Sequence, residues 1–277
     1  MGNKSYMSNV SVHGDVRTVS LPPRDWGRLS YRVLIWGGLI LAFAWSWAPA
    51  EMHRFVNLYT HSQNMREYAS GFFRPNFHEF DYYVLEMILT VQIAIWGTGL
   101  AIVAAVPLAI LSSSNMAPIW VAQPIRRLMD MFRAINELVF AVLFVVAVGL
   151  GPFAGVMALF IHTTGVLVKL FSEAVEAIDP QPVEGIRATG ANRLQEVIYG
   201  VIPQVLPLWM SVSLYRFESN VRSATVLGLV GAGGIGQVMF ESIRSFQYAE
   251  TAAILIIVVL TVTVTDVLSQ QLRRLVI

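Results

Sequence analysis

The sequence has no cysteine among its 277 residues, and charged residues make up only 13% of it. The missing thiols exclude disulfides, thiolate metal sites and cysteine nucleophiles. Soluble domains usually carry about 25% charged residues, whereas 55% of this chain is hydrophobic and its mean hydropathy is +0.59. The shortage of charge therefore indicates a membrane protein rather than a soluble enzyme.

Signatures of several other protein classes are also missing. The chain has no G-x-x-x-x-G-K-[ST] stretch, so it does not supply a P-loop ATP site of its own. It has no basic tail and no interleaving of aromatic and basic residues of the kind that nucleic-acid binders use. His53, His61 and His78 lack the spacing and companion ligands of a metal site. We therefore expect no metal, no cofactor and no nucleic-acid partner. The apolar runs also offer no nucleophile–base pair for an intramembrane enzyme.

Long apolar runs dominate what is present. Six runs of about 20 mostly apolar residues, the length that spans a bilayer, predict six transmembrane helices in an all-α protein: 33–50, 84–111, 134–151, 153–172, 204–227 and 251–270. The first 32 residues lack the short apolar core and cleavage site of a signal peptide, so the first run is predicted to be a retained anchor.

The basic residues predict the orientation. With the N-terminus inside, thirteen of the nineteen lysines and arginines lie in inner segments, four in outer segments and two within the fifth run. The inner group includes Arg126, Arg127 and Arg133, which fall in a predicted inner loop after the second run. Because basic residues concentrate on the cytoplasmic side, both termini are predicted to be cytoplasmic.

These spans divide the chain into four predicted parts: a cytoplasmic tail over 1–32, a first spanning helix over 33–50, an outer segment over 51–83 and a transport core over 84–277. The outer segment contains nine aromatic residues. Such a segment can lie on the bilayer surface, or it can dock an external partner. Both interpretations stay open.

The inner loop over 172–203 predicts a helix–glycine–helix elbow. A first short helix fits residues 180–189 and stops at Gly190, which suits the position after a helix C-terminus. A second can begin at Asn192, whose side chain caps the helix with Gln195 as its capping-box partner three residues on. An elbow of this shape at the membrane face can sit in a groove of another protein.

This loop resembles the EAA loop of binding-protein-dependent ABC importer permeases, in which E-A-A is followed by three residues, Gly, nine residues and I-x-L-P. Glu184, Gly190 and Pro203 match at the right spacing, whereas Gly185 and Ile186 replace the two alanines. The stretch EAIDPQPVEGIRATGAN, with YGVIPQVLP and SLYRFESNVRSATVLGLVGAGGIG after it, is similar to the phosphonate-type (PhnE-type) permeases in particular. That resemblance covers about residues 84–277.

The resemblance implies a homodimeric inner-membrane permease with a MetI-like core. It implies two copies of a separate ATPase, which hold ATP and Mg, and a periplasmic binding protein that delivers an anion. The residues implied in contact with the ATPase are those of the elbow: Glu184, Gly185, Arg187, Ala188 and Gly190. The anion can be a phosphonate, phosphite, hypophosphite or phosphate ester. A permease for another small solute and an ion-coupled secondary transporter are the alternatives.

Three charges interrupt the fifth run. Glu218 precedes Arg222 by four residues, the favourable order for an ion pair within a helix, which predicts a structural role for the pair. Arg216 has no acidic residue three or four positions away. Counted from Gln204, it lies about 18 Å along the helix, near the middle of a hydrocarbon core about 30 Å thick.

Hydrogen-bonding side chains share a face with Arg216. Spacings of three and four gather them on one arc: Arg216, Ser219, Asn220 and Ser223. Because guanidinium and hydroxyl donors suit a tetrahedral oxyanion, this arc is predicted to line the path of an anion. The alternative is that Arg216 pairs with a carboxylate elsewhere, such as Glu137.

Two further groups of polar residues lie in the third and fourth runs. Asn136 and Glu137 are predicted near the inner end of the third run, as an inner gate or as a bridge to Arg216. His162, Thr163 and Thr164 in the fourth run are predicted to form hydrogen bonds between helices.

A glycine cluster follows the fifth run. Residues 231–236 match G-x-G-x-x-G literally, but dinucleotide binding also needs a βαβ unit and an acidic residue about 20 positions on, where the chain has Ile256. We instead expect a break at the outer end of the helix, followed by a short helix over 237–248. By the resemblance, Gly231, Gly233, Gly234 and Gly236 lie near a periplasmic gate; a tight turn without gating is the alternative.

Overall fold

A computed structural model describes residues 10–13, 16–19, 26–60 and 62–276. The chain divides into two units, residues 1–66 and 67–277. In the first unit, β1 (Val10–His13) and β2 (Val16–Val19) form an antiparallel hairpin in which Val10 pairs with Val19. This hairpin lies within the predicted tail and is the one departure from all-helical structure among the described residues.

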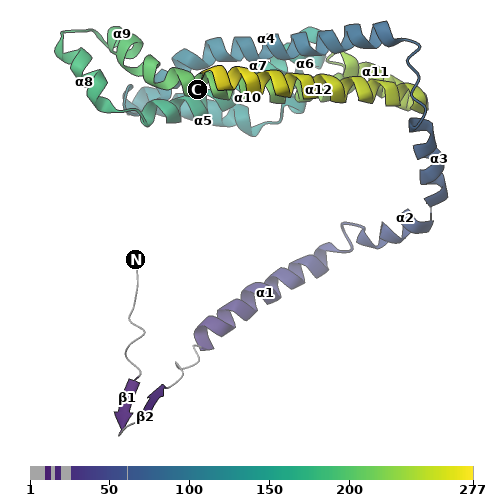
Figure 1. The fold of residues 1–277 in the computed structure, drawn as a ribbon, viewed down its shortest axis with the longest axis horizontal. Coiled ribbons are helices and arrows are strands. Elements are labelled where there is room, and N and C mark those ends of the chain that lie inside the picture. The colour runs from purple at the N-terminus through teal and green to yellow at the C-terminus, as the bar shows by residue number, and fades with distance from the viewer. Residues whose placement is uncertain (1–9, 14–15, 20–25, 61, 277) are drawn as a thin grey trace. The chain divides into compact units, whose positions relative to one another are not determined.

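The first unit continues as helices (Figure 1). They are α1 (Trp26–Ser46), the 3-10 turn η1 (Met52–Arg54) and α2 (Phe55–Thr60), and α3 (Ser62–Phe72) then crosses into the second unit. The helix α1 begins earlier and ends earlier than the predicted first span, 33–50. Its described apolar part, Ser30–Ser46, is shorter than the 18 residues needed to qualify as a span.

Four long helices lie side by side in the second unit (Figure 1): α4 (Phe80–Ser112), α7 (Pro152–Glu176), α10 (Ile202–Leu227) and α12 (Tyr248–Val276). Shorter elements connect them: α5 (Ile119–Ala134), α6 (Glu137–Val148), α8 (Pro180–Ala188), α9 (Arg193–Gln195), the π-helix η2 (Glu196–Val201), the 3-10 turn η3 (Gly228–Val230) and α11 (Ile235–Arg244). The helix α11 confirms the short helix expected after the glycine cluster.

The described residues contain four helices long and apolar enough to span a membrane, or five if α5 and α6 count as one broken span. The predicted third span, 134–151, is wrong in its length and shape. The helix α6 has only 12 residues and is bent by 89° from α5. Asn136 explains where the bend falls, because its side chain accepts a hydrogen bond from Leu138 N (2.9 Å) and so starts a new helix. The predicted inner loop that holds Arg126 is instead the helix α5.

Small residues bring the central helices close together. The helix α4 packs against α7, and five of its buried residues are small: Ala94, Gly97, Ala101, Ala105 and Ala109. A Cβ on Gly97 would lie 2.7 Å from Leu159 Cβ, and one on Gly165 would lie 2.8 Å from Met129 O of α5. Small residues allow such close backbone approach where there is little apolar driving force between helices in lipid.

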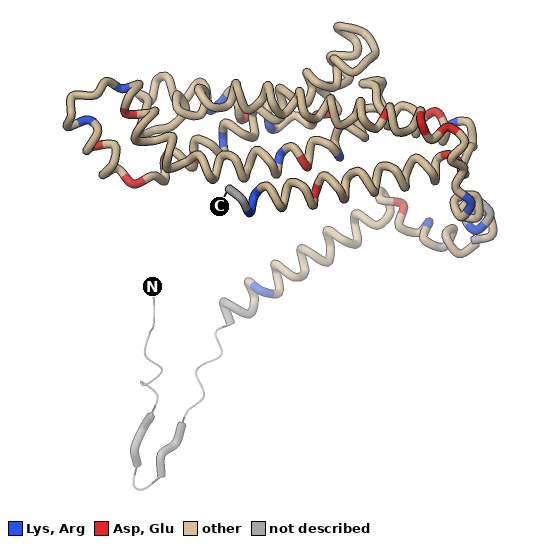
Figure 2. Tube along the Cα trace, turned by 45° about the horizontal axis from the view of Figure 1, so that its top comes forward, with Lys and Arg blue, Asp and Glu red and all other residues tan. Residues whose placement is uncertain are grey.

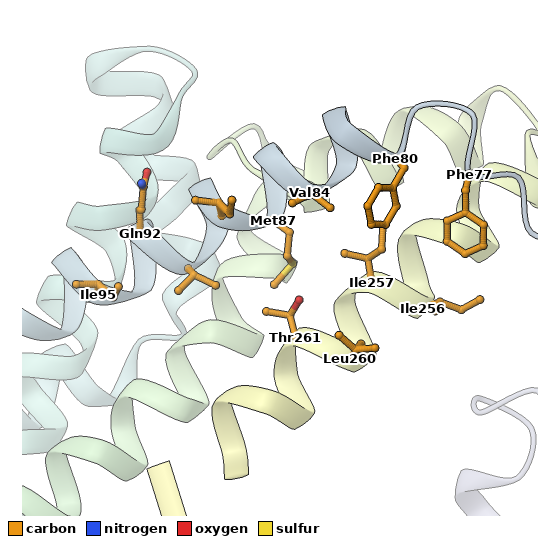
Figure 3. Close-up of a pocket in the computed structure, with 12 residues that line it drawn as sticks. Phe77, Phe80, Val84, Met87, Gln92, Ile95, Ile256, Ile257, Leu260 and Thr261 are labelled. Carbon is orange, nitrogen blue, oxygen red and sulfur yellow. The ribbon is translucent and has the colours of Figure 1, made fainter. Parts of the chain in front are cut away.

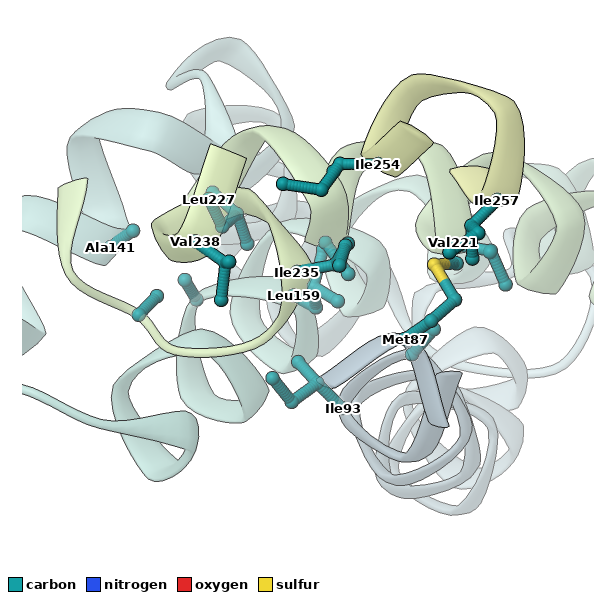
Figure 4. Packing of buried hydrophobic residues seen from close by; sticks show 14 of the residues in the cluster. Met87, Ile93, Ala141, Leu159, Val221, Leu227, Ile235, Val238, Ile254 and Ile257 are labelled. Atoms are coloured by element: carbon teal, nitrogen blue, oxygen red, sulfur yellow. The ribbon is translucent and has the colours of Figure 1, made fainter. Parts of the chain in front are cut away.

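Two clusters of buried apolar side chains fill the bundle. One contains Ile93, Leu159, Leu227, Ile235 and Ile254 and lies toward the glycine cluster (Figure 4). The other lies toward the elbow, where the rings of Phe171 and Trp209 stack with their centroids 4.7 Å apart. Residues of four or more helices meet in each cluster, so the bundle is held as one body.

The glycine cluster forms a buried turn between α10 and α11. Gly231, Gly233 and Gly234 have φ of +89°, +79° and +76°, a region that side chains other than glycine rarely adopt. The turn is anchored from two sides, because Gly151 N donates to Gly231 O (2.9 Å) and Ile235 N donates to Thr90 Oγ1 (2.9 Å). The predicted helix break is confirmed, and the described residues around it contain no βαβ unit.

Gly236→Ala is expected to destabilise the protein. The added Cβ would lie 1.9 Å from Thr225 O, so α10 and α11 must separate, and overpacking of this kind costs about 1–3 kcal/mol. Thermal unfolding of the purified protein measures the loss. Gly185→Ala is the matched control: nothing lies within 4 Å of its Cβ position, and alanine within a helix adds about 0.5–1 kcal/mol of stability. Equal melting temperatures for the two variants would contradict this packing.

Candidate translocation site and coupling elbow

Asn220 ties α10 to two other helices. Its Nδ2 donates to Thr98 Oγ1 of α4 (2.8 Å) and to Thr163 Oγ1 of α7 (3.0 Å). Its side chain is buried, with 1% exposed. The predicted helix-to-helix hydrogen bond of Thr163 is confirmed. The structure does not support the predicted place of Asn220 on an anion path, because its amide is enclosed among three helices.

Glu218 is the acceptor for two arginines. Arg222 Nη2 lies 3.1 Å from Glu218 Oε1, which confirms the predicted pair, and Arg273 Nη2 of α12 lies 3.2 Å from Oε2. Arg222 also reaches Asp266 of α12, at 3.4 Å. The network therefore joins α10 to α12 and supports the structural role predicted for the pair.

The network also shows how α10 and α12 are aligned along their length. Glu218 is aligned with the C-terminal part of α12, where Arg273 lies in the last turn, and Arg222 is aligned with Asp266, farther from that end.

Arg216 differs from the other charged residues of α10. Its Nε is buried and has no hydrogen-bond partner among the described residues. Its charge interacts through space with the Glu137 carboxylate, but the two side chains form no ion pair within 4.0 Å. The predicted alternative, a direct Arg216–Glu137 pair, is therefore not formed. Figure 2 shows how sparsely charged residues occur along these helices.

Glu137 joins three helices beside this face of α10. Its Oε1 accepts a hydrogen bond from Ser223 Oγ (2.8 Å), and His162 Nε2 of α7 lies 3.5 Å from its Oε2. His162 Nδ1 lies 2.9 Å from Ile135 O, at the α5–α6 break. The prediction that Asn136 and Glu137 lie near the inner end of their span is wrong, because the bend places them level with His162, near the middle of α7.

The two serine hydroxyls on this face of α10 differ in their hydrogen bonds. Ser223 is engaged by Glu137, whereas Ser219 has no hydrogen bond among the described residues. Arg216 and Ser219 are one helical turn apart, so two unengaged donors lie on the same face of α10 as Ser223, which binds Glu137. We call Arg216, Ser219, Ser223 and Glu137 the α10 strip.

The elbow has the predicted shape. Its first helix, α8, ends before Gly190, whose φ is +85°. Both hydrogen bonds of the capping box between Asn192 and Gln195 are present. Asp179, which the sequence pattern did not single out, caps α8 through a bond from Gln181 N to its Oδ1 (3.0 Å).

A bidentate ion pair closes the elbow. Arg187 Nε and Nη2 donate to the two carboxylate oxygens of Glu196, each at 2.9 Å, and the Glu196 side chain is only 7% exposed. The hydrogen bonds from Arg187 to Glu196 raise the pKa of the Arg187 guanidinium above its ordinary value. Arg187, which was predicted to contact the ATPase, therefore holds α8 to η2. Glu184, Gly185 and Ala188 remain exposed on α8.

The elbow is joined to the bundle at two places. Gln204 of α10 accepts from Asp179 N (3.1 Å) and donates to Gly200 O (2.7 Å). At the end of α7, Glu176 accepts from Ser114 N (2.7 Å) and from Arg126 of α5. The Gln204 bonds connect the elbow to α10, and the Glu176 bonds connect the end of α7 to α5 and to the end of α4.

An apolar groove lies between α4 and α12 (Figure 3). It encloses about 540 Å³, and Gln92 and Thr261 are the polar side chains among its apolar lining, which includes Val84, Met87 and Leu260. None of its lining residues is charged, so the groove is unsuited to an anion.

Comparison with known proteins decides the family. The model of the family described as "Binding-protein-dependent transport system inner membrane component" matches residues 97–277. The chain belongs to this family. It is therefore a multi-pass permease component of an importer and not an enzyme. ATP hydrolysis belongs to a separate ATPase subunit, and the family also works with a substrate-binding protein. Membership decides against an ion-coupled secondary transporter.

Individual relatives confirm the resemblance to phosphonate-type permeases. The phosphite transport system permease protein PtxC of Stutzerimonas stutzeri is 34% identical over 96% of this chain and 99% of its own length. The putative cryptic phosphonate transport system permease protein PhnE2 of Escherichia coli (strain K12) is 67% identical over 43% of this chain and 97% of its own. An inward-facing structure of the MetNI methionine ABC transporter covers 72% of this chain and 99% of its own, with a TM-score of 0.64 at 19% identity, which confirms the MetI-like fold.

Glu218→Gln is expected to lower the stability of the permease. The change neutralises the shared acceptor of Arg222 and Arg273, and lost hydrogen bonds to charged groups cost about 1.5–3 kcal/mol, less where a partner is as exposed as Arg222. Thermal unfolding measures this effect. Glu241→Gln on α11, whose exposed carboxylate accepts from Gln237, is the control. A Glu218→Gln protein with unchanged stability but altered substrate choice would assign Glu218 to the path instead.

Proposed function

We propose that this permease carries phosphonate- or phosphite-type oxyanions, and that the α10 strip forms part of their path. The observation that carries the proposal is Arg216, whose Nε is buried without a partner next to the free hydroxyl of Ser219. A charge left unpaired in a membrane bundle is costly and usually serves a substrate or ion. The names of the relatives support an oxyanion as that substrate.

The proposed path keeps Arg216, Ser219 and Ser223 of the residues predicted to line it, adds Glu137, and leaves out Asn220. Asn220 is enclosed among helices, so its amide is not available to an anion. Asn136 caps α6 with its Oδ1, whereas its Nδ2 has no hydrogen-bond partner among the described residues. Glu218 and Arg222 hold α10 against α12. Within the α10 strip, Arg216 and Ser219 have donors that no described residue uses.

We further propose that two copies of the chain form the transport unit. Both termini would lie in the cytoplasm, with the tail over 1–32 on that side of the membrane and the segment over 51–83 on the other. A two-fold axis would present each α10 strip twice around a shared path. Two ATPase subunits would bind the elbows through the exposed surface of α8, with Glu184, Gly185, Ala188 and Gly190, while Arg187 keeps each elbow rigid.

Alternating access then follows from how the elbow is attached. ATPase closure would move α8, and the bonds of Asp179 to Gln204 and of Glu176 to Arg126 would carry the movement into α10, α5 and α4. At the opposite end, the turn of Gly231, Gly233, Gly234 and Gly236 would act as the periplasmic gate. Because this turn is hydrogen-bonded to Thr90 and Gly151, a movement of α10 would also shift α4 and the link between α6 and α7.

Arg216→Ala tests the path. In proteoliposomes containing the permease, its ATPase and its binding protein, we expect phosphite and methylphosphonate uptake to fall at least about tenfold, the value of one charge-assisted hydrogen bond. The complex should still assemble, because Arg216 forms no ion pair in the structure.

Arg127→Ala is the control for this experiment. Its side chain on α5 is 80% exposed and only 4.0 Å from Asp130 at its nearest, so the change should leave uptake intact. An assembled Arg216→Ala complex that imports both anions at the wild-type rate would overturn the path.

A further inference from the structure

Glu137 is out of place in a path for anions. A bare carboxylate repels a passing oxyanion, yet this one points at Ser223 on the same face of α10 as Arg216. It is not neutralised by a close ion pair with arginine, and His162 Nε2 at 3.5 Å from Oε2 is its nearest basic group. A function for this carboxylate must therefore use it as a hydrogen-bond acceptor.

The α10 strip has hydrogen-bond donors at one end and a hydrogen-bond acceptor at the other. Arg216 and Ser219 offer N–H and O–H donors that nothing in the described chain uses. Glu137 of α6 contacts Ser223, which lies one to two helical turns farther along α10 than Arg216 and Ser219. A ligand that bridges these residues must accept hydrogen bonds from Arg216 and Ser219 and donate one to Glu137.

A tetrahedral oxyanion that retains one proton meets this requirement. Its unprotonated oxygens accept from Arg216 and Ser219, and its P–OH group donates to the Glu137 carboxylate, a charge-assisted bond. A fully ionised oxyanion, such as sulfate, would place a lone pair against the carboxylate and leave it unsatisfied. Sites built to pair with a substrate O–H reject analogues that lack it.

We infer that Glu137 is a specificity-determining residue, which makes the permease select oxyanions that carry a P–OH group and reject fully ionised ones. The inference rests on the proposed path through Arg216 and names the ionic form that the path accepts. Phosphite and phosphonates supply that form near neutral pH, because their second proton dissociates there.

Two isomeric anions test the inference directly. Ethylphosphonate and methyl methylphosphonate have the same atoms, and each carries one negative charge at a mildly acidic pH, but only ethylphosphonate keeps a P–OH. Binding to the permease–ATPase complex, measured by calorimetry without the binding protein, is expected to favour ethylphosphonate at least about tenfold. A single pH keeps the charges of His162 and Arg216, which face Glu137 from α7 and α10, the same for both ligands; Arg133 on α5 is engaged by Asp130 (2.9 Å).

Variants then assign the preference to one residue. Glu137→Gln removes the charge of the acceptor and should reduce the preference to within about threefold. Glu173→Gln, an exposed partner of Lys169 on α7, should leave it unchanged. Equal binding of the two isomers by the wild-type complex overturns the inference whether or not the variants fold, as does failure to bind either isomer. An unchanged preference in Glu137→Gln overturns the role of Glu137.

The uptake experiment separates this inference from the proposed function. If Arg216→Ala abolishes phosphite uptake but the isomers bind equally, the path stands and the selection of a protonated anion fails. If Arg216→Ala leaves uptake intact, the path itself fails, whatever the isomers show.

Discussion

The hydrogen bonds of Asn220 to Thr98 and Thr163 decide which way α10 is turned. Polar groups inside a membrane bundle must be satisfied by protein, so this buried amide has to face α4 and α7. Once it does, Glu218 and Arg222 face α12, where Arg273 and Asp266 neutralise them. Ser223 then bonds to Glu137 of α6, and Arg216 and Ser219 lie on the same face of α10 as Ser223. The division of one helix into a side paired with α12 and a side that carries the proposed path follows from that single bridge.

The start of α10 connects this helix to the elbow. The helix α10 begins directly after η2, and Gln204 bonds back to Asp179 and Gly200. Gly200 stands where the family pattern has isoleucine, and a Cβ at this position would already lie 3.2 Å from Val183, so a small residue lets η2 pack against α8. With Arg187 bound to Glu196, α8 is held to η2, which continues directly into α10. In the proposed mechanism, a movement of α8 would therefore reach the α10 strip along a single helix.

Local rules predicted the elbow, and long-range contacts account for what was missed. Proline, glycine and capping residues mark the ends of α8 and α9 in the sequence itself, and Glu218 and Arg222 are neighbours on one helix. Asp266 and Arg273 lie more than forty positions from their partners, and no periodicity connects them. Asn220 lies only about 40° from Arg216 on a helical wheel, too close for the pattern to separate a buried face from an open one. The α5–α6 bend was missed because residues 134–151 were assigned to one span although the capping residue Asn136 lies within it.

Cysteine accessibility along α10 tests the central claim most directly, that Asn220 fixes the rotation of this helix. The chain contains no cysteine, so each single substitution introduces the sole thiol of the permease. In the assembled importer, Ser219→Cys and Ser223→Cys should react with a charged methanethiosulfonate reagent and be protected by phosphite. Val221→Cys and Ala224→Cys, at positions 0% and 1% exposed, should not react. Labelling at positions 221 and 224, without labelling at positions 219 and 223, would contradict the account.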